Sequence, residues 1–360
     1  MEKTKEDIPG YPGNAQACGI DVMEATGGNG VSGNGSNAWA CGIDGIGSNA
    51  RACGIDGIGA TGGSGVNKGR KRQPVQNNNA PIGVFDSGFG GLTVARKIAQ
   101  ALPHESIVYF GDTARCPYGP RSLEEVDGFV QQIGSWLLDR GVKLLVIACN
   151  TGTAAGLGHA QMSFDVPVLG VVEPGARAAA LATKNRRVGV IATKATVESD
   201  AYTRAIRNID AGITVFSTAT PRFVEIAEQG IRMAEGPIEN YTSLASKVYI
   251  RPAFQEIARE YLEPLRRCDI DTLVLGCTHF PLLKALIGGI IGRKVTLISS
   301  ANEVAREVAE ILDRQGTHAA PGHLPHHEFF TTGHDVEEFK GFGSRVLRMP
   351  LERVSHVDLD

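Results

Sequence analysis

Two short apolar runs that each end in a cysteine restrict the fold of this 360-residue chain more than any other feature. Residues 144–148 precede Cys149, and residues 273–276 precede Cys277. Runs of Leu, Val and Ile of this kind are typical of strands that are buried on both faces of a parallel sheet. Because ligands bind at the carboxyl edge of such a sheet, we expect both thiols at a binding edge.

Short strands alternate with helical patterns from residue 81 onward. The apolar runs predict strands at residues 82–85, 106–110, 143–148, 168–171, 188–192, 214–217, 272–275 and 295–298. The helical patterns predict helices at residues 93–102, 123–140, 176–182, 199–208, 221–229, 253–267 and 301–314. This alternation indicates an α/β fold of two similar lobes, in which helices flank parallel sheets and the site lies in the cleft between the lobes.

The amino-terminal segment differs in composition from the rest of the chain. Residues 1–80 hold 18 of the 45 glycines and few large apolar side chains, so they cannot bury enough surface to offset their ordering entropy. We therefore predict a disordered leader that is rich in Gly and Asn. Its unit Ala-Cys-Gly-Ile-Asp occurs three times, which leaves open a thiol-bearing arm that binds a metal or a partner.

Beyond the leader, the pattern predicts two lobes of similar construction. The first α/β lobe comprises residues 81–173 and 287–360, and the second comprises residues 174–286. The turn-prone segment Glu-Pro-Gly at residues 173–175 is expected to connect them. One cysteine at a strand end therefore falls in each lobe.

Charge and apolar content exclude several classes of partner. The net charge of -3 gives no general attraction to nucleic acid or to anionic membranes. The start of the chain does not read as a signal sequence, and no run of about 18 apolar residues occurs, so we expect a cytoplasmic protein without membrane contacts. Seven cysteines without a CxxC spacing indicate reduced thiols and no metal site.

Cys149 is followed by residues that suit an anionic ligand. Asn150 and Thr151 come next, in a segment that is typical of a helix start. Free backbone N–H groups at a helix start bind carboxylates and lower the pKa of a thiol from its usual value of about 8.5. We therefore expect a reactive Cys149, and a cysteine that only packs in the core is the alternative.

The second cysteine has different neighbours. Thr278 and His279 follow Cys277, and an imidazole at this position can orient a substrate or exchange a proton with it. Two thiols that face one another across a substrate can act as acid and base on opposite faces of one carbon. The alternative for His279 is a purely structural role.

The first predicted strand also ends in polar residues. Asp86 and Ser87 are followed by a glycine-rich turn at residues 88–91. Such a turn permits the close approach of a carboxylate or phosphate, but it lacks the GxGxxG order of a dinucleotide site and the lysine of a phosphate loop. The carboxylate of Asp86 could accept the proton of a neighbouring thiol.

Two further loops add hydrogen-bonding groups at strand ends. Tyr118 and Gly119 follow the second predicted strand, and Thr196 follows the strand at 188–192. Together these strand ends describe a small polar cavity that suits a compact, charged molecule.

Five motifs in a fixed order resemble glutamate racemases, of the cofactor-independent aspartate/glutamate racemase family. The motifs are Asp86-Ser87-Gly88, residues 109–113 with Pro117-Tyr118-Gly119, Ala148-Cys149-Asn150-Thr151, residues 170–175, and Gly276-Cys277-Thr278-His279. The resemblance extends from residue 81 to residue 360. It implies an amino-acid racemase, an isomerase that interconverts L- and D-glutamate and supplies D-glutamate for peptidoglycan, without pyridoxal phosphate, another cofactor or a metal.

The resemblance also implies roles for individual residues. The thiolate of Cys149 would remove the α-proton of D-glutamate while the thiol of Cys277 protonates the opposite face, with the roles reversed for L-glutamate. Asp86 is similar to the helper of the first thiol, and His279 with Glu228 to the helpers of the second. The implied substrate contacts are Asp86, Ser87, Tyr118, Gly119, Asn150, Thr151, Thr196, Thr278 and His279.

Three other functions are alternatives on the sequence. An aspartate racemase would have the same architecture, and a non-catalytic module would bind a small dicarboxylate at the two strand ends. A thiol-based redox or acyl-transfer enzyme is the third, but no Ser/His/Asp or CxxC arrangement supports it. We expect a homodimer that acts on a small molecule and does not bind nucleic acid.

Overall fold

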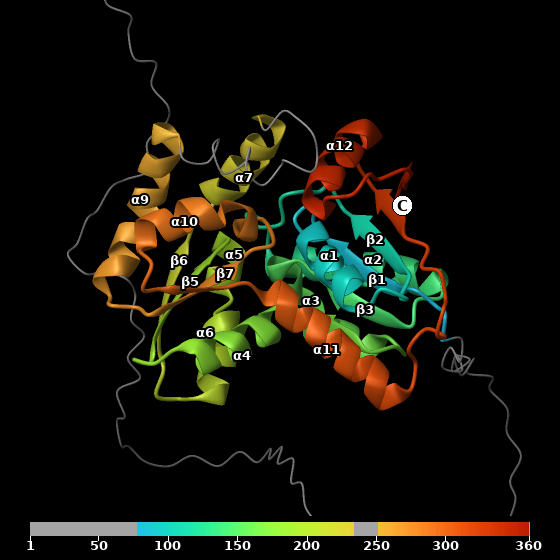
Figure 1. Cartoon of the computed structure of the whole chain (residues 1–360), viewed down its shortest axis with the longest axis horizontal. Helices are drawn as coiled ribbons and strands as arrows, with labels where there is room; N and C mark the ends of the chain where they lie inside the picture. The colour runs from blue at the N-terminus through green and yellow to red at the C-terminus, as the bar shows by residue number, and fades with distance from the viewer. Residues whose placement is uncertain (1–77, 234–250, 360) are drawn as a thin grey trace, which may run out of the picture. The chain divides into compact units, whose positions relative to one another are not determined.

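The computed structural model describes residues 78–233 and 251–359. The predicted leader lies outside the described residues, apart from its last three. Two parallel sheets form the framework of the described part (Figure 1).

The larger sheet has six strands in the order β10-β9-β2-β1-β3-β4, and every neighbouring pair is parallel. Its strands are β1 (Ile82–Asp86), β2 (Ile107–Gly111), β3 (Leu144–Ile147), β4 (Val168–Gly170), β9 (Glu328–Thr331) and β10 (Val354–His356). Parallel pairing brings the carboxyl ends of β1, β2 and β3 to one edge. Asp86 is the last residue of β1, and Cys149 follows β3 by two residues.

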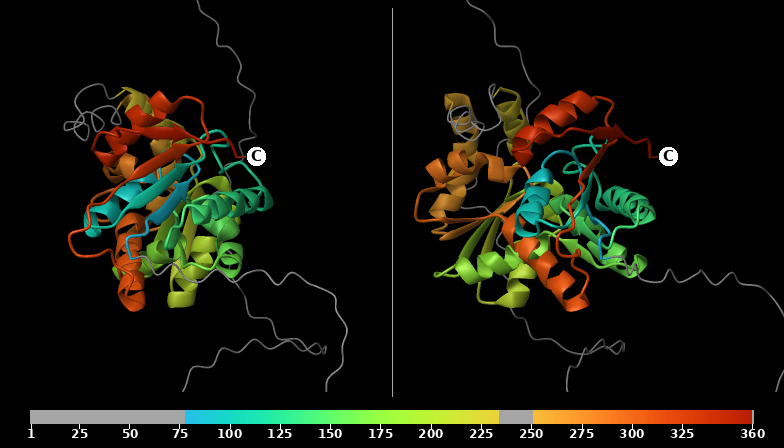
Figure 2. Two further views of the ribbon diagram at one scale, coloured as in Figure 1. Left: turned by 90° about the vertical axis from the view of Figure 1, so that its right-hand side faces the viewer. Right: turned by 45° about the vertical axis from the view of Figure 1, so that its right-hand side comes forward.

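Both faces of the larger sheet are covered by helices, as Figure 2 shows. Val84 and Val146 face one core with Leu92, which also includes side chains of α11 and α12. Phe85 and Leu145 face the opposite core, with side chains of α2 and α3. The helices are α1 (Leu92–Ala101), α2 (Leu123–Asp139), α3 (Asn150–Ser163), α11 (Ser300–Gln315) and α12 (Val336–Leu347). Burial on both faces explains why these strands are almost wholly apolar.

The smaller sheet has the parallel order β6-β5-β7-β8. Its strands are β5 (Arg187–Ala192), β6 (Thr214–Ala219), β7 (Thr272–Gly276) and β8 (Thr296–Ile298). Val190 and Val274 pack with α4 and α6 on one face, and Leu275 packs with α7, α9 and α10 on the other. The helices are α4 (Val172–Ala182), α5 (Lys194–Glu198), α6 (Ala201–Ile209), α7 (Arg222–Met233), α9 (Pro252–Arg267), the short η2 (Phe280–Leu283) and α10 (Lys284–Ile291).

A buried ion pair lies at the edge of the larger sheet where the strands begin. Lys143 Nζ lies 2.6 Å from Glu105 Oε2, and only 2% of each side chain is exposed. The same ammonium donates to the carbonyl oxygens of Asn78 at 2.6 Å and Thr317 at 2.7 Å. These bonds satisfy a charge that would otherwise be costly to bury, and they hold Asn78 and Thr317 at this edge.

The structure confirms the predicted α/β class with two parallel sheets, and each of the eight predicted strands forms within two residues of its expected bounds. The segment at residues 173–175, which was expected to connect the lobes, forms the first turn of α4; this helix follows β4 of the larger sheet and packs on the smaller one. The helix expected at 199–208 forms as α6 and begins two residues later, because Asp200 has a left-handed backbone (φ 55°) between α5 and α6.

We propose two lobes, one around each sheet, with one change to the predicted boundaries. β8 pairs with β7, so residues 296–298 belong with the smaller sheet and the second boundary moves beyond them. No helix within residues 78–233 and 251–359 is long and apolar enough to cross a membrane.

Candidate active site

Cys149 caps the amino terminus of α3 and is buried, with 6% of its surface exposed. Its Sγ accepts a hydrogen bond of 3.4 Å from the backbone N–H of Gly152 and donates to Ser87 Oγ at 3.8 Å. The helix start therefore reaches the sulfur, as the sequence predicted. Thr153, one turn into the helix, is held by the carbonyl of Ile147 and does not compete for the thiol.

The predicted lowering of the Cys149 pKa is wrong. Burial raises the pKa of this thiol to about 12, and the negative charge of Asp86 acts in the same direction. The hydrogen bonds from Gly152 and with Ser87 oppose the shift but do not outweigh the loss of hydration. In the free protein, Cys149 is therefore a thiol at neutral pH.

Cys277 directly follows β7, and its partner is a histidine. His279 Nδ1 lies 3.8 Å from Cys277 Sγ, and His279 Nε2 lies 3.3 Å from Glu228 Oε1 of α7, an ion-pair distance without well-aligned hydrogen-bond geometry. Thus the structure brings Cys277 together with His279 and Glu228, the two helpers that the resemblance implied.

The charges around the second thiol form a chain. Burial lowers the pKa of His279, but the contacts with Cys277 and Glu228 outweigh it and raise this pKa to about 10. Burial raises the pKa of Glu228, yet the contact with His279 and the charge of Arg232 lower it overall. A protonated imidazole between a carboxylate and a sulfur stabilises negative charge on that sulfur.

Asp86 lies at the carboxyl end of β1 and is wholly buried. Its Oδ2 accepts a hydrogen bond of 3.1 Å from Gly88 N, and its Oδ1 accepts one of 3.3 Å from Thr278 Oγ1. Burial raises the pKa of Asp86, against the positive charge of His279 and these hydrogen bonds. A carboxyl group with a raised pKa is better suited to accept a proton than an ordinary surface aspartate.

The glycine-rich turn after β1 lies close to the segment that carries the second thiol. A Cβ at Gly90 would overlap Thr278 Oγ1 and would lie 2.6 Å from His279 Nδ1. A Cβ at Gly91 would overlap the side chain of Asp86. The glycines therefore allow the loop after β1 to contact the residues that follow Cys277.

Three threonine hydroxyl groups meet where α3 contacts α5. Thr151 Oγ1 lies 2.9 Å from Thr193 Oγ1 and 3.2 Å from Thr196 Oγ1, and the latter two lie 2.9 Å apart. Thr193 also caps α5, and it was not among the candidate residues named from the sequence. Its position before a short helical segment is an N-cap signal that could have identified it.

The loop after β2 is held by a buried carboxylate that sequence reasoning did not single out. Asp112 accepts hydrogen bonds from the Tyr118 hydroxyl, from Arg115 Nε at 2.7 Å and from Thr332 Oγ1 at 2.8 Å. Next to Tyr118, the carbonyl oxygen of Gly119 accepts from Ala195 N at 3.2 Å. The Tyr118 loop therefore contacts the start of α5.

Asn150, the first residue of α3, has a partner from the smaller sheet. The Tyr202 hydroxyl donates a hydrogen bond of 2.7 Å to Asn150 Oδ1, and both side chains are buried. Tyr202 lies inside a predicted helix and follows no strand end, so the pattern that found the other polar residues could not find it.

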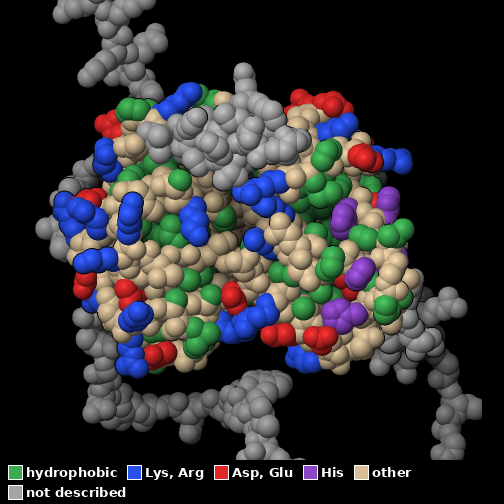
Figure 3. All heavy atoms as spheres, viewed as in Figure 1, with side chains coloured by type: hydrophobic (Ala, Val, Ile, Leu, Met, Phe, Trp, Pro, Cys, Tyr) green, Lys and Arg blue, Asp and Glu red, His purple; other side chains and the backbone are tan. Residues whose placement is uncertain are grey.

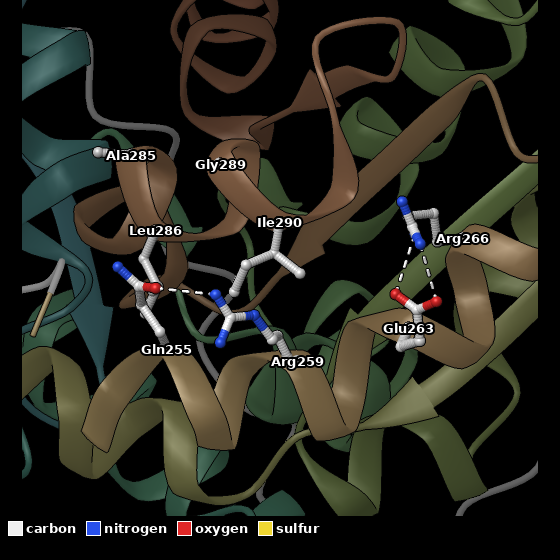
Figure 4. Close-up of a pocket in the computed structure, with 8 residues that line it drawn as sticks. All are labelled: Gln255, Arg259, Glu263, Arg266, Ala285, Leu286, Gly289 and Ile290. Atoms are coloured by element: carbon white, nitrogen blue, oxygen red, sulfur yellow. Dashed lines mark hydrogen bonds and ion pairs between the residues drawn. The ribbon is translucent and has the colours of Figure 1, made fainter. Parts of the chain in front are cut away.

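A separate cavity of about 260 Å³ lies between α9 and α10, where Lys and Arg side chains gather on the face drawn in Figure 3. Arg259 donates to Gln255 and Arg266 pairs with Glu263, so these polar groups satisfy one another (Figure 4). The cavity contains none of the predicted site residues. Within the described part of the chain, no group of three or more His, Cys, Asp or Glu side chains could hold a metal ion.

Comparison with known proteins agrees with this geometry. Residues 82–308 match the family described as Asp/Glu/Hydantoin racemase. Glutamate racemase of Exiguobacterium sibiricum is 44% identical over 274 residues, covering 76% of this chain and 94% of the relative. That of Listeria monocytogenes is 45% identical over 278 residues, covering 77% and 98%.

Solved structures give the same result. The glutamate racemase isoform RacE1 of Bacillus anthracis has a TM-score of 0.70 and 42% identity, covering 79% of this chain and 99% of that chain. The glutamate racemase of Francisella tularensis in complex with D-glutamate has a TM-score of 0.68 and 33% identity, with the same coverage. This chain therefore belongs to the Asp/Glu/hydantoin racemase family, and within it to the group of the glutamate racemases.

Proposed function

We propose that the chain interconverts L- and D-glutamate by a two-base mechanism with Cys149 and Cys277. The observation that carries the proposal is a pair of buried thiols beyond the ends of two parallel strands, each with its own helper. The two thiols lie within electrostatic range, because negative charge on Cys277 contributes to the raised pKa of Cys149. The relative from Francisella that binds D-glutamate supports the choice of substrate.

The reaction breaks one C–H bond and forms another on the same carbon. With D-glutamate, the thiolate of Cys149 takes the α-proton, the electron pair stays on the α-carbon, and the thiol of Cys277 donates a proton to the opposite face. With L-glutamate, the two cysteines exchange roles. Because the α-proton is far less acidic than a thiol, the site must supply positioning and electrostatic stabilisation, and no cofactor is assigned a step.

The helpers act on the two thiols in different ways. Asp86 is a buried carboxyl group with a raised pKa, which suits it to take the Cys149 proton before D-glutamate reacts. His279 carries positive charge next to Cys277 Sγ, and Glu228 stabilises that charge. Each cysteine therefore reaches its thiolate form by a different route, one through a proton acceptor and one through an ion pair.

The substrate contacts are proposed along the same edge. Ser87, Asn150 and Thr151 come from the larger sheet, and Thr196 and Thr278 come from the smaller one. Their hydroxyl and amide groups, with Tyr118 and Gly119, would supply donors to the two carboxylates of glutamate and acceptors to its ammonium group. We further propose that the protein acts in the cytoplasm as a homodimer and supplies D-glutamate for peptidoglycan.

The direct test is the loss of optical rotation from pure L-glutamate with no added cofactor. In D₂O, deuterium should enter the α-position, whereas a binding module would leave glutamate protonated. Aspartate, assayed in parallel, should react much more slowly. Equal or faster racemisation of aspartate would assign the chain to the alternative substrate.

Cysteine variants test the two bases. Cys149→Ala and Cys277→Ala should each abolish racemisation, because each removes the acid or base for one face. Cys268→Ala is the matched control, since this half-buried thiol at the end of α9 bonds to the carbonyl of Pro264 and should leave activity unchanged. Near-normal turnover by either of the first two variants would exclude the two-base mechanism.

A further inference from the structure

Tyr202 of α6 contacts the segment that carries the second thiol. It is buried, with 2% of its surface exposed, and its ring packs against two glycines. A Cβ at Gly276 would lie 3.0 Å from Tyr202 Cε2, and a Cβ at Gly175 would lie 3.2 Å from the Tyr202 hydroxyl oxygen. Gly276 directly precedes Cys277. A side chain at position 276 would therefore collide with the Tyr202 ring.

The same side chain contacts the segment that carries the first thiol. The Tyr202 hydroxyl donates to Asn150 Oδ1 at 2.7 Å, and Asn150 directly follows Cys149. Because α6 packs on the smaller sheet and α3 on the larger one, this bond joins the two halves of the site. Tyr202 is therefore in contact with a direct neighbour of each cysteine.

The hydrogen bond decides how the Asn150 side chain is turned. An amide accepts at its oxygen and donates at its nitrogen, so a donor bound to Oδ1 leaves the two N–H groups of Nδ2 for an acceptor. Within residues 78–233 and 251–359, the Asn150 side chain makes no other hydrogen bond. Burial, aided by negative charge on Cys277, raises the pKa of Tyr202, so its hydroxyl keeps its proton and remains a donor.

We propose that Tyr202 is a positioning residue whose hydroxyl orients the Asn150 amide, so that Nδ2 donates to a carboxylate of the bound amino acid. The proposal rests on the proposed function, because the carboxylate is that of glutamate. Without the phenol, the amide can rotate and present its oxygen, which repels a carboxylate. The effect of Tyr202 on the reaction therefore passes through Asn150.

The test removes the hydroxyl and keeps the ring. Tyr202→Phe should lower kcat/KM about tenfold, mainly through a higher KM, with only a small decrease in the melting temperature, because Asn150 Oδ1 loses its donor. The loss in kcat/KM should be equal for both enantiomers, because the free enantiomers have the same energy. In an Asn150→Ala background, Tyr202→Phe should cause little further loss, which is the coupling that a double-mutant cycle measures.

One control variant and a second test variant complete the experiment. Tyr261→Phe, on α9, is the matched control and should leave both constants unchanged. Asn150→Asp can still accept from Tyr202 but has no N–H donor, so it should raise KM at least as much as Tyr202→Phe, and it decides the question where Tyr202→Phe does not fold. A normal KM in either variant, or an equal loss from Tyr202→Phe with and without Asn150, overturns the proposal. If the wild-type protein did not racemise glutamate, the proposed function itself would be wrong.

Discussion

Asp86 Oδ1 accepts a hydrogen bond of 3.3 Å from Thr278 Oγ1, which joins the carboxyl end of β1 to the residue after Cys277. The same carboxylate acts electrostatically on Cys149. One buried carboxyl group is thus connected to the surroundings of both thiols, although the two belong to different sheets.

We expect catalysis to depend on the carboxylate charge of Asp86 and not only on the size of its side chain. Asp86→Asn keeps the size of the side chain and one of its two accepting oxygens but cannot take a proton, so kcat should fall by about 10²- to 10⁴-fold, the usual contribution of a general base. Steady-state kinetics should detect little change in KM. Asp313→Asn, a change at a largely exposed position, should be neutral. A kcat close to that of the wild type in Asp86→Asn would exclude a proton-transfer role.

The raised pKa of Cys149 predicts how its reactivity depends on pH. Because this pKa is about 12, the thiolate fraction at neutral pH is small and should rise about tenfold for each pH unit. The rate of Cys149 alkylation by iodoacetamide, followed by peptide mass spectrometry, should rise accordingly between pH 7 and pH 9. Cys268 in the same digest is an internal reference. A rate that is already constant at pH 7 would contradict the shift.

Gly90 should not tolerate even a methyl group. Gly90→Ala would overlap Thr278 Oγ1 and His279 Nδ1, and displacing these atoms should cost about 10²-fold in kcat/KM. The matched control is Gly128→Ala in α2, where a Cβ meets nothing within 4 Å. This variant should remain active and gain about 0.5–1 kcal/mol in the free energy of unfolding, measured with urea. Full activity of Gly90→Ala would show that the segments can separate at no cost.

The threonine cluster should contribute to both stability and binding. Thr193→Val removes the cap of α5 and one hydroxyl of the cluster, so it should lower the free energy of unfolding by about 1 kcal/mol and raise KM for glutamate. Thr193→Ser keeps the hydroxyl and should restore both. Equal behaviour of the Val and Ser variants would mean that the hydroxyl has no role.

The stability of the protein should depend on pH through His279. The pKa of His279 is raised from 6.5 to about 10, so the folded protein holds a proton that the unfolded chain has released. The resulting stabilisation is complete below pH 6.5 and is lost as the pH rises through about 10. Urea unfolding should therefore give a steeper decline in stability between pH 7 and pH 10 for the wild type than for His279→Gln. Parallel curves would refute the linkage.

The strands that position the thiols could be predicted from the sequence because burial on both faces leaves long apolar runs. β9 and β10 could not, because they are short strands of three or four residues near the carboxyl end of the chain, and their pairing depends on partners distant in the sequence. The sequence of α10 contains Gly288 and Gly289 within an apolar run, and it lacks the periodicity that identifies a helix facing solvent on one side.

The sequence pointed to candidate site residues where polar side chains follow strand ends. It did not point to Tyr202, which lies within a helix and acquires its contact with Asn150 only through the fold. Thr193 and Asp112 directly follow β5 and β2, but their contacts with Thr151 and Thr332 come from distant segments. The pKa of Cys149 was predicted with the wrong sign, because the sequence displays the helix start but not the depth of burial. Burial is a property of the assembled fold, and here it outweighs the N–H of Gly152.

The ion pair of Glu105 and Lys143 has a practical consequence for handling the protein. It fastens Asn78 at the amino ends of the strands, whereas the cysteines follow their carboxyl ends. A covalent tether to a solid support, attached at Asn78 itself, would thus be held at the edge of the sheet away from the thiols. Immobilisation through this residue should leave the path for a soluble substrate open.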